Sequence, residues 1–263
     1  MPNLSVIVPV FNKEKHIVQA IDRLESTLKK AKIDYEIIVV DDGSTDNTRR
    51  KLHERKKKSP KRMKVLRMKN NAGKGFAIRE GFKIAQSESI AFIDGDLDIP
   101  SFQLPEFYKH LIDLNADGVV GSKRQPGTRI EWSVYRSFLS AGFICLVRFL
   151  FPWLNVKDTQ VGIKIFRRKV LTQAFPVMRV DHWTFDLELL LYLLKGGYRL
   201  VEHPVEIYQA STDTNLKRIS VLRMGIEILI LFYRWYISRY YQKNSKTIGN
   251  PTNEPFESST PAV

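Results

Sequence analysis

Cysteine is nearly absent from this chain of 263 residues, which contains only Cys145. A single cysteine excludes an internal disulfide and a cysteine-rich zinc site, and it suits a reducing compartment. Because Cys145 lies in an apolar run, we expect it to be a buried structural residue. The 5 histidines show no metal-ligand spacing, so we expect them to be structural or exposed.

Long uninterrupted apolar runs are absent as well. The longest, at 138–154 and 226–237, contain charged residues or proline and fall short of the roughly 20 apolar residues that span a bilayer. Both combine aliphatic side chains with Trp and Arg, which fits either a buried helix or an amphipathic helix at a membrane surface. The N-terminus has no basic lead and no small-residue cleavage site, so we expect no signal peptide.

Two nucleotide-binding signatures are also missing. No Gly-x-Gly-x-x-Gly follows the first apolar run and no Gly-x-x-x-x-Gly-Lys-Ser/Thr occurs, so neither a dinucleotide cofactor nor a P-loop ATPase is indicated.

Acidic residues are in the minority, and the net charge of +14 implies a nucleic acid, an anionic lipid or a phosphorylated substrate as partner. The basic run at 49–67 lacks interleaved aromatic residues, so we interpret it as a solvated helix and loop and expect no nucleic-acid partner.

Short apolar runs alternate with segments of helical spacing, a pattern typical of an α/β fold with a mostly parallel sheet. The expected strands cover 4–9, 35–40, 63–68, 90–93, 118–121 and 199–205, and the later expected helices cover 185–195 and 220–241. Residues 243–263 are rich in Ser, Thr, Asn and Pro and are expected to be disordered. The length favours a single domain over 1–242.

Three carboxylates end the apolar run at 90–93. Asp94, Asp96 and Asp98 occupy alternate positions, and alternation along an extended chain would turn them to the same side. They would repel one another unless a cation lay between them, which predicts a divalent metal site. An acidic turn after a buried strand is the alternative.

Two further acids, Asp41 and Asp42, follow the second expected strand. Gly43 permits a tight turn before a helix, so the segment could be a plain strand-to-helix connection. The alternative is that Asp42 accepts hydrogen bonds from a nucleotide base or ribose, as acids do after the second strand of dinucleotide folds. The acidic run at 94–98 favours this second interpretation.

Four segments resemble, in order, the motifs of family 2 glycosyltransferases with the GT-A fold: VPVFNKE, DDGSTDNT, NNAGKGFAIREG and DGDLD. The later segments GSKR, DTQVGIKIF and HWTFDLELL are similar to the polyprenyl-phosphate branch, the dolichyl-phosphate glucose and mannose synthases, with HWTFDLELL leaning towards the glucosyltransferases. The resemblance implies a Rossmann-like, mostly parallel sheet flanked by helices. It also implies that the helices near 132–154 and 220–241 lie at a membrane interface.

The same resemblance implies roles for the residues at matching positions. Mg2+ or Mn2+ would be held by Asp94, Asp96 and Asp98, with Asp98 at a position where many mannose synthases have Gln. The nucleotide sugar would contact Pro9, Phe11, Glu14, Asp42, Lys74, Asp94 and Lys217, with Arg218 as the alternative to Lys217. The acceptor phosphate would contact Lys123, Arg124, Arg136 and Ser140. The catalytic set would be Asp96, Arg124, Arg136, Gln160 and Lys164, with Asp158 orienting the last two.

The implied activity is inverting transfer of glucose, mannose or N-acetylglucosamine from a UDP- or GDP-sugar to dolichyl or polyprenyl phosphate, at the cytoplasmic face of a membrane. A lipid phosphate is already ionised, so its attack needs no protein base. The alternatives are transfer to a saccharide or protein hydroxyl and a basic nucleic-acid-binding protein. Processive synthases carry Gln-x-x-Arg-Trp, whereas Leu231 stands at the Gln position here, which argues against such a synthase.

Asp186 and Glu188 lie two positions apart in an expected helix. They would lie on different faces of it, so at most one would point at the site.

Overall fold

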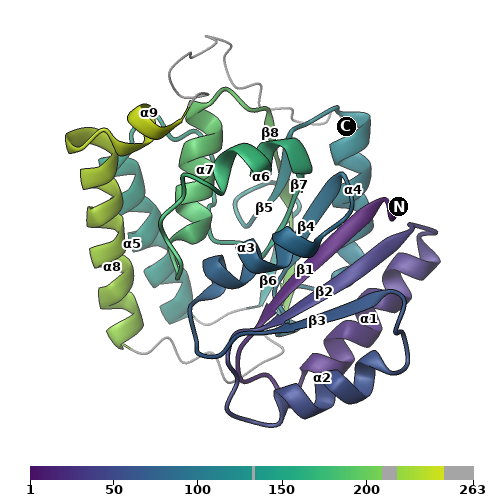
Figure 1. The fold of residues 1–263 in the computed structure, drawn as a ribbon. Helices are drawn as coiled ribbons and strands as arrows, with labels where there is room; N and C mark the ends of the chain where they lie inside the picture. The colour runs from purple at the N-terminus through teal and green to yellow at the C-terminus, as the bar shows by residue number, and fades with distance from the viewer. Residues whose placement is uncertain (132–133, 209–217, 246–263) are drawn as a thin grey trace.

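A seven-stranded sheet forms the centre of the computed structural model, which describes residues 1–131, 134–208 and 218–245 (Figure 1). The strand order is β3-β2-β1-β4-β7-β5-β8, and neighbours are parallel except at β7, which is antiparallel to β4 and β5. The strands are β1 (Leu4–Val10), β2 (Tyr35–Asp41), β3 (Met63–Arg67), β4 (Ser89–Ile93), β5 (Gly118–Ser122), β7 (Ile163–Arg167) and β8 (Leu200–Pro204). The predicted α/β class with a mostly parallel sheet is confirmed.

Helices cover both faces of this sheet and extend to one side of it (Figure 1). They are α1 (Ile17–Lys30), α2 (Thr48–Lys56), α3 (Lys74–Ile84), α4 (Leu104–Asp113), α5 (Val134–Leu150), α6 (Arg168–Ala174), α7 (Phe185–Lys195), α8 (Arg218–Phe232) and α9 (Tyr240–Asn244). Shorter elements are the 3-10 turn η1 (Ser101–Gln103), the π-helical turn η2 (Tyr233–Ile237), and the strands β6 (Arg129–Glu131) and β9 (Glu206–Tyr208), which pair with each other.

Strand β2 illustrates why the sheet is covered on both faces. All of its residues are buried, and Ile38 and Val40 join the core on one face while Ile37 and Val39 join the core on the other. The first core includes residues of α3, α6 and α7, and the second includes residues of α1, α2 and α4. Each buried Ile or Val contributes about 1.5–3 kcal/mol relative to an exposed side chain, so such a strand is stable only between two helical layers.

A buried ion pair joins α1 to α2. Arg55 of α2 donates to Glu25 and Asp22 of α1, and the side chains of Glu25 and Arg55 are 7% and 5% exposed. Burial alone would raise the pKa of Glu25, but hydrogen bonds from Lys29, Arg55 and Ser59 outweigh it and lower the pKa to about 2. The run at 49–67 is therefore not wholly solvated as predicted, because Arg55 belongs to the core side of α2.

Helices α5 and α8 lie on the same side of the molecule (Figure 1), and the residues that follow them are in contact. Phe151 and Trp235 pack edge to face with ring centroids 6.5 Å apart, and Trp153 Nε1 donates to the Tyr236 hydroxyl at 2.8 Å. Cys145 of α5 is exposed, so the expectation of a buried cysteine is wrong. The run at 138–154 is apolar on nearly all sides and therefore carries no periodicity that marks its inner face. Among the described residues, no helix is both long and apolar enough to cross a bilayer.

The predicted final helix over 220–241 is divided in the structure. α8 passes into the π-helical turn η2, and Arg239 then adopts a left-handed conformation (φ 50°) before α9 begins. The disordered segment was predicted from residue 243, but Lys243 and Asn244 belong to α9. Ser245 is buried and its hydroxyl lies 2.7 Å from that of Tyr192. The folded part thus extends three residues further, and residues 246–263 lie outside the described part of the chain.

Candidate active site

Asp94, Asp96 and Asp98 lie in a turn directly after β4, the middle strand of the sheet. The chain turns at Leu97, whose φ of 69° is in the left-handed region, and the Asp98 backbone N–H donates to Asp96 Oδ1 at 3.3 Å. Our expectation that an extended strand aligns the three acids is therefore wrong. A non-glycine residue in this conformation costs roughly 1–3 kcal/mol, and such strain is concentrated at functional turns.

The acids of this turn repel one another. Burial raises the pKa of Asp96, and the adjacent charge of Asp98 raises it further. Burial also raises the pKa of Asp94, although the ammonium group of Lys74 opposes it. A divalent cation beside Asp96 and Asp98 would relieve the repulsion, and carboxylate oxygens are ligands that Mg2+ and Mn2+ accept. The donor set of the turn therefore fits such an ion.

A chain of alternating charges runs from the turn into the core. Lys74, the first residue of α3, lies 2.9 Å from Asp94 Oδ1 and 3.3 Å from Asp186 Oδ2. Lys164 of β7 donates to the other oxygen of Asp186 at 2.7 Å, and its side chain is 1% exposed. Burial would raise the pKa of Asp186, but the two lysines lower it, whereas burial lowers the pKa of Lys164. Lys164 therefore acts on the turn through Asp186 and Lys74 rather than by direct contact.

The prediction that Asp186 and Glu188 lie on different faces of their helix is confirmed. Asp186 points to the two lysines, whereas Glu188 accepts hydrogen bonds from the backbone N–H groups of Arg179 and Val180 and from the Tyr241 hydroxyl. Glu188 is fully buried, and burial raises its pKa. Of these two acids, Asp186 is the one that belongs to the site.

Gly162, in the segment DTQVGIK, allows the close approach of Asp94. A Cβ atom at residue 162 would lie 1.9 Å from Asp94 Oδ2, much closer than any real contact. A side chain at residue 162, where β7 begins, would therefore force the Asp94 carboxylate to move. Nothing in the spacing of DTQVGIK predicts this, because the two residues are far apart in the sequence.

Asp42 holds the loop that leads into α3. Its two carboxylate oxygens accept hydrogen bonds from the backbone N–H groups of Ala72 and Gly73, both at 2.8 Å. Gly73 has a φ of 104°, which favours glycine, and it precedes Lys74 directly. Asp42 thus positions Lys74, and its predicted contact with a nucleotide stays a prediction.

A second polar group surrounds Asp158. Its carboxylate accepts from the backbone N–H of Gln160 at 3.0 Å, and it lies 3.3 Å from the Lys123 ammonium. Asp158 itself is held by Glu202, which accepts its backbone N–H at 3.2 Å. Arg124 follows Lys123 at the end of β5 and is exposed. Asp158 therefore orients Gln160 and Lys123, while Lys164 is oriented by Asp186.

The end of β1 and the loop after it contribute three of the predicted residues and one that was not predicted. Pro9 lies within β1, Phe11 beyond it is 40% exposed, and the Glu14 carboxylate accepts from the Asn47 backbone N–H at 2.9 Å. Lys13 lies 3.9 Å from Asp96 Oδ2. Lys13 lies in the motif VPVFNKE, which could have singled it out, but it was not among the predicted site residues.

The predicted acceptor residues Arg136 and Ser140, and the nucleotide-sugar residue Lys217 with its alternative Arg218, are only partly described. Arg136 and Ser140 both lie on α5, and Ser140 is half-buried. The side chain of Arg136 and all of Lys217 lie outside the described residues, as does the side chain of Arg218, which begins α8.

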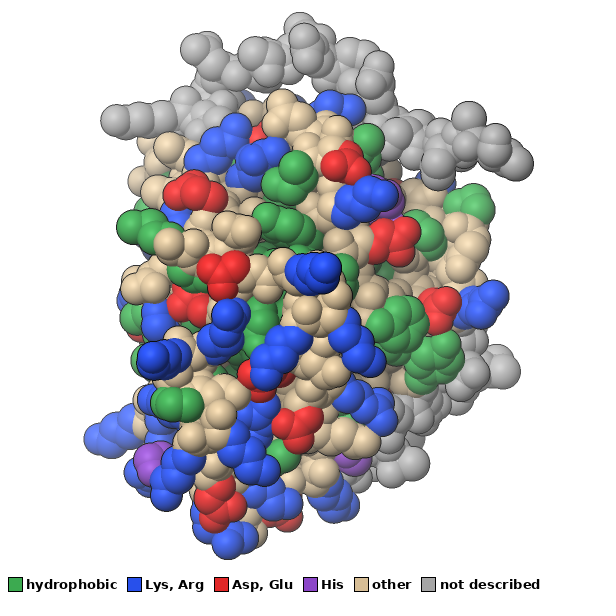
Figure 2. All heavy atoms as spheres, turned by 90° about the vertical axis from the view of Figure 1, so that its right-hand side faces the viewer, with side chains coloured by type: hydrophobic (Ala, Val, Ile, Leu, Met, Phe, Trp, Pro, Cys, Tyr) green, Lys and Arg blue, Asp and Glu red, His purple; other side chains and the backbone are tan. Residues whose placement is uncertain are grey.

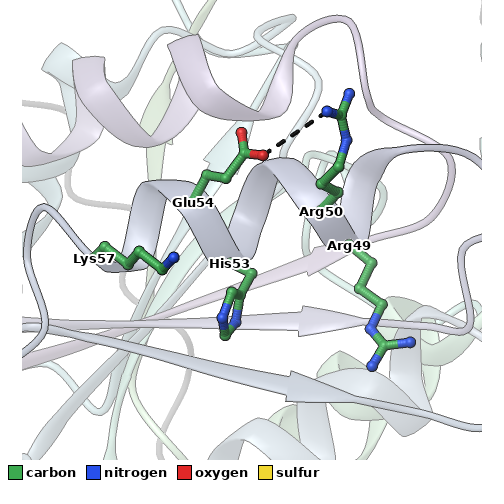
Figure 3. Close-up of a pocket in the computed structure, with 5 residues that line it drawn as sticks. All are labelled: Arg49, Arg50, His53, Glu54 and Lys57. Carbon is green, nitrogen blue, oxygen red and sulfur yellow. Dashed lines mark ion pairs between the residues drawn. The ribbon is translucent and has the colours of Figure 1, made fainter.

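Basic side chains also gather on one face of the molecule. Figure 2 shows Lys and Arg side chains on the lower half of one face, at the height of α1 and α2 in Figure 1. A hollow of about 390 Å³ is lined by Arg49, Arg50, His53, Glu54 and Lys57 (Figure 3). Its one acid, Glu54, lies 3.9 Å from Arg50, so the hollow offers no carboxylate pair for a metal ion.

Known proteins resemble the chain in sequence and fold. Residues 5–175 match glycosyl transferase family 2. The chain belongs to this family. Human dolichyl-phosphate beta-glucosyltransferase is 31% identical over 88% of the chain and 75% of the human protein. The Dictyostelium discoideum dolichyl-phosphate beta-glucosyltransferase is 29% identical over 89% of the chain and 75% of the relative.

Among solved structures, glucosyl-3-phosphoglycerate synthase from Mycobacterium tuberculosis, in complex with Mn2+, UDP and phosphoglyceric acid, has the same fold. The TM-score is 0.69 at 20% identity, over 91% of the chain and 78% of the synthase. The part that matches family 2 includes the acidic turn, Lys74 and Lys164, but it ends before Asp186. The alternating charges that run from Asp94 through Lys74 and Asp186 to Lys164 therefore include one residue, Asp186, beyond the matched region.

Proposed function

We propose that the chain transfers a hexose from a nucleotide sugar to dolichyl or another polyprenyl phosphate. The observation that carries this proposal is the pairing of the carboxylates after β4 with lysines from other elements. Lys74 contacts Asp94 and Lys13 lies near Asp96, in a chain that belongs to family 2. Relatives named dolichyl-phosphate beta-glucosyltransferase support the lipid phosphate as acceptor and glucose as the first sugar to test. UDP-glucose is the first donor to test, with GDP-sugars as the comparison.

A nucleotide sugar brings a diphosphate whose negative charge grows as the sugar departs. Asp96 and Asp98 would hold Mg2+ or Mn2+, and Asp94 stays the third predicted ligand. The bound cation would neutralise charge on the diphosphate. Lys13, 3.9 Å from Asp96, places a further positive charge at the same turn. Lys74 keeps Asp94 in place through their contact at 2.9 Å.

The acceptor phosphate needs positive charge rather than a base. Its ionised oxygen would form a bond to the anomeric carbon while the bond from that carbon to the diphosphate breaks, which inverts the configuration. Asp186 is bound to two lysines that lower its pKa, so it is poorly suited to remove a proton from a hydroxyl. Lys123, Arg124, Arg136 and Ser140 are the residues that we propose for the acceptor phosphate.

A membrane surface would supply the lipid. The outer faces of α5 and α8 carry large exposed apolar side chains, with Phe149 82%, Ile226 50%, Leu229 57% and Ile230 43% exposed. Apolar helix faces flanked by arginine and aromatic residues are typical of interfacial helices, and a net charge of +14 favours anionic lipid. We propose that this face lies on the cytoplasmic side of a membrane.

The test incubates the purified chain with dolichyl phosphate, Mg2+ or Mn2+, and a panel of labelled UDP- and GDP-sugars, and then measures label in the organic phase. We expect label from one hexose donor only when metal is present. Asp96→Asn should reduce transfer at least 100-fold, while Asp113→Asn, on the exposed end of α4, should retain it. Metal-independent transfer, or label that appears only on added saccharides, would contradict the proposal.

Arg136 offers a second test. Arg136→Ala should raise KM for the lipid phosphate more than KM for the nucleotide sugar, because we propose that this residue contacts the acceptor. Steady-state kinetics with each substrate varied in turn measures both. Equal changes in the two KM values would place Arg136 elsewhere.

A further inference from the structure

A second cluster of metal-ligating side chains lies outside the acidic turn. Glu106 and His110 stand one turn apart on α4, and His203 comes from β8 at the edge of the sheet. The three side chains each offer a ligand atom within 4.8 Å of the others, and among the described residues no other Asp, Glu, His or Cys group of three does so. The sequence predicted no histidine metal site, and it could not reveal this one, because the two histidines are 93 positions apart in the chain.

Backbone contact fixes the tautomer of His203. Its Nδ1 lies 2.7 Å from the carbonyl oxygen of Pro204, and a carbonyl oxygen can only accept, so Nδ1 carries the proton. In the neutral ring the lone pair is then on Nε2, which lies 3.4 Å from Glu106 Oε1. Metal-bound histidines are typically oriented in this way, with the non-ligating nitrogen donating to a carbonyl group.

His110 completes the cluster beside it. The two imidazole rings lie with centroids 4.7 Å apart, and Phe107 packs on the other side of His203 at 4.9 Å. His110 Nδ1 is buried and has no hydrogen-bond partner among the described residues. Buried polar atoms without a partner are rare, and each is a candidate position for an unseen ligand or water molecule.

We propose that Glu106, His110 and His203 bind Zn2+ or a similar borderline transition-metal cation, separately from the ion at the acidic turn. Zn2+ bound tetrahedrally at about 2.0–2.1 Å separates neighbouring ligand atoms by about 3.4 Å, and His203 Nε2 and Glu106 Oε1 already have this separation. The ligand atoms within 4.8 Å need to move by about 1 Å or less to reach tetrahedral spacing. Water would take the fourth position. Imidazole nitrogen favours zinc, whereas the oxygen ligands of the acidic turn favour magnesium or manganese.

The ion would join α4 to the end of β8, which continues towards the acidic turn. Beyond Pro204, the Glu206 backbone N–H donates to Gln103 Oε1 at 2.7 Å, and the Tyr208 backbone N–H donates to the Asp98 carbonyl at 2.9 Å. A cation at His203 would therefore stabilise the segment that contacts Asp98. Its function in this proposal is structural.

Metal titration of the full-length chain tests the proposal. Co2+ replaces Zn2+ at such sites and gives a visible absorption band that is strong in tetrahedral and weak in octahedral coordination. We expect one equivalent of Co2+ to produce the strong band with excess Mg2+ present, and Zn2+ to abolish it. Zn2+ at 100 times its dissociation constant should raise Tm by about 5 °C or more. Asp96→Asn should leave both effects unchanged.

Two variants identify the ligands without removing the packed His203. His110→Ala and the exposed Glu106→Gln should each weaken Zn2+ binding at least tenfold and reduce the Tm shift, with the circular dichroism spectrum retained. His53→Ala is the matched control, because His53 is exposed on α2, and it should bind Zn2+ as the unmodified chain does. Unchanged Zn2+ affinity in both ligand variants, or loss of the strong band in Asp96→Asn, would overturn the proposal.

Discussion

Replacing Asp186 by Asn leaves the buried Lys164 ammonium without its carboxylate partner, and we expect the fold to lose about 3–5 kcal/mol of unfolding free energy. The two groups are 2.7 Å apart, and their side chains are 1% and 5% exposed. With an effective dielectric constant of about 20, the Coulomb attraction at this distance is about 6 kcal/mol. Desolvation offsets part of it in the intact pair, but in Asp186→Asn the lysine stays desolvated with the Val161 carbonyl and no carboxylate as partner.

Lys164→Met should cost less than Asp186→Asn, because Asp186 keeps a second cation. Lys74 lies 3.3 Å from its other oxygen. Lys164→Met removes the desolvated ammonium together with its hydrogen bonds to Asp186 and the Val161 carbonyl, so we expect a net loss of about 1.5–3 kcal/mol. The double variant should be more stable than the sum of the single losses predicts, by about 1.5 kcal/mol or more. The order of the single variants follows from the number of partners that each group has.

Urea unfolding followed by circular dichroism, at pH 7 and at pH 9.5, measures these differences. Burial lowers the pKa of Lys164 and the Asp186 carboxylate opposes this, so the pKa should fall further in Asp186→Asn. The folded variant then binds fewer protons than the intact protein, and its stability rises more steeply with pH. The deficit of Asp186→Asn should therefore shrink at the higher pH. Asp34→Asn is the control: its ion pair with Arg62 is about half exposed, and its removal should cost less than about 1 kcal/mol. A deficit of Asp186→Asn below about 1 kcal/mol, or additive single losses, would refute the reasoning.

Three further predictions concern other parts of the chain. Gly162→Ala should displace Asp94 and reduce transfer at least tenfold, whereas Gly142→Ala, where a Cβ atom meets nothing within 4 Å, should keep full activity in the same assay. Glu25→Gln should lose about 3 kcal/mol at pH 7, since the folded-state pKa of about 2 lies below the usual 4.5. That contribution is present above pH 4.5 and disappears as the pH falls towards 2, so unfolding curves of the two proteins should converge there, and a constant difference would contradict it. Leu229→Asp should reduce co-sedimentation with anionic lipid vesicles. It should leave Tm within about 2 °C, because Leu229 is 57% exposed. Unchanged sedimentation would count against α8 as a membrane-facing helix.

The strands and the position of the candidate site could be predicted because their signal is local. β2 is a nearly continuous apolar run, which is typical of a strand with helices on both faces of its sheet. The acids come directly after β4 in the sequence, so their position at its carboxyl end needs no tertiary information. Helical periodicity also separated Asp186 from Glu188 correctly. Periodicity failed for Cys145, whose segment is apolar all round, and its exposure depends on which side of α5 faces the core.

The sequence by itself determined the α/β class, the family motifs and the carboxylates of the acidic turn, because runs, turns and spacing are properties of neighbouring residues. Only the tertiary structure decided which charges meet. Lys164 is bound to Asp186 instead of facing solvent, Lys13 reaches Asp96, and the ring of His110 lies beside that of His203. These contacts join elements far apart in the chain, and they exist because strand order and helix packing place those elements side by side. No local pattern encodes that arrangement.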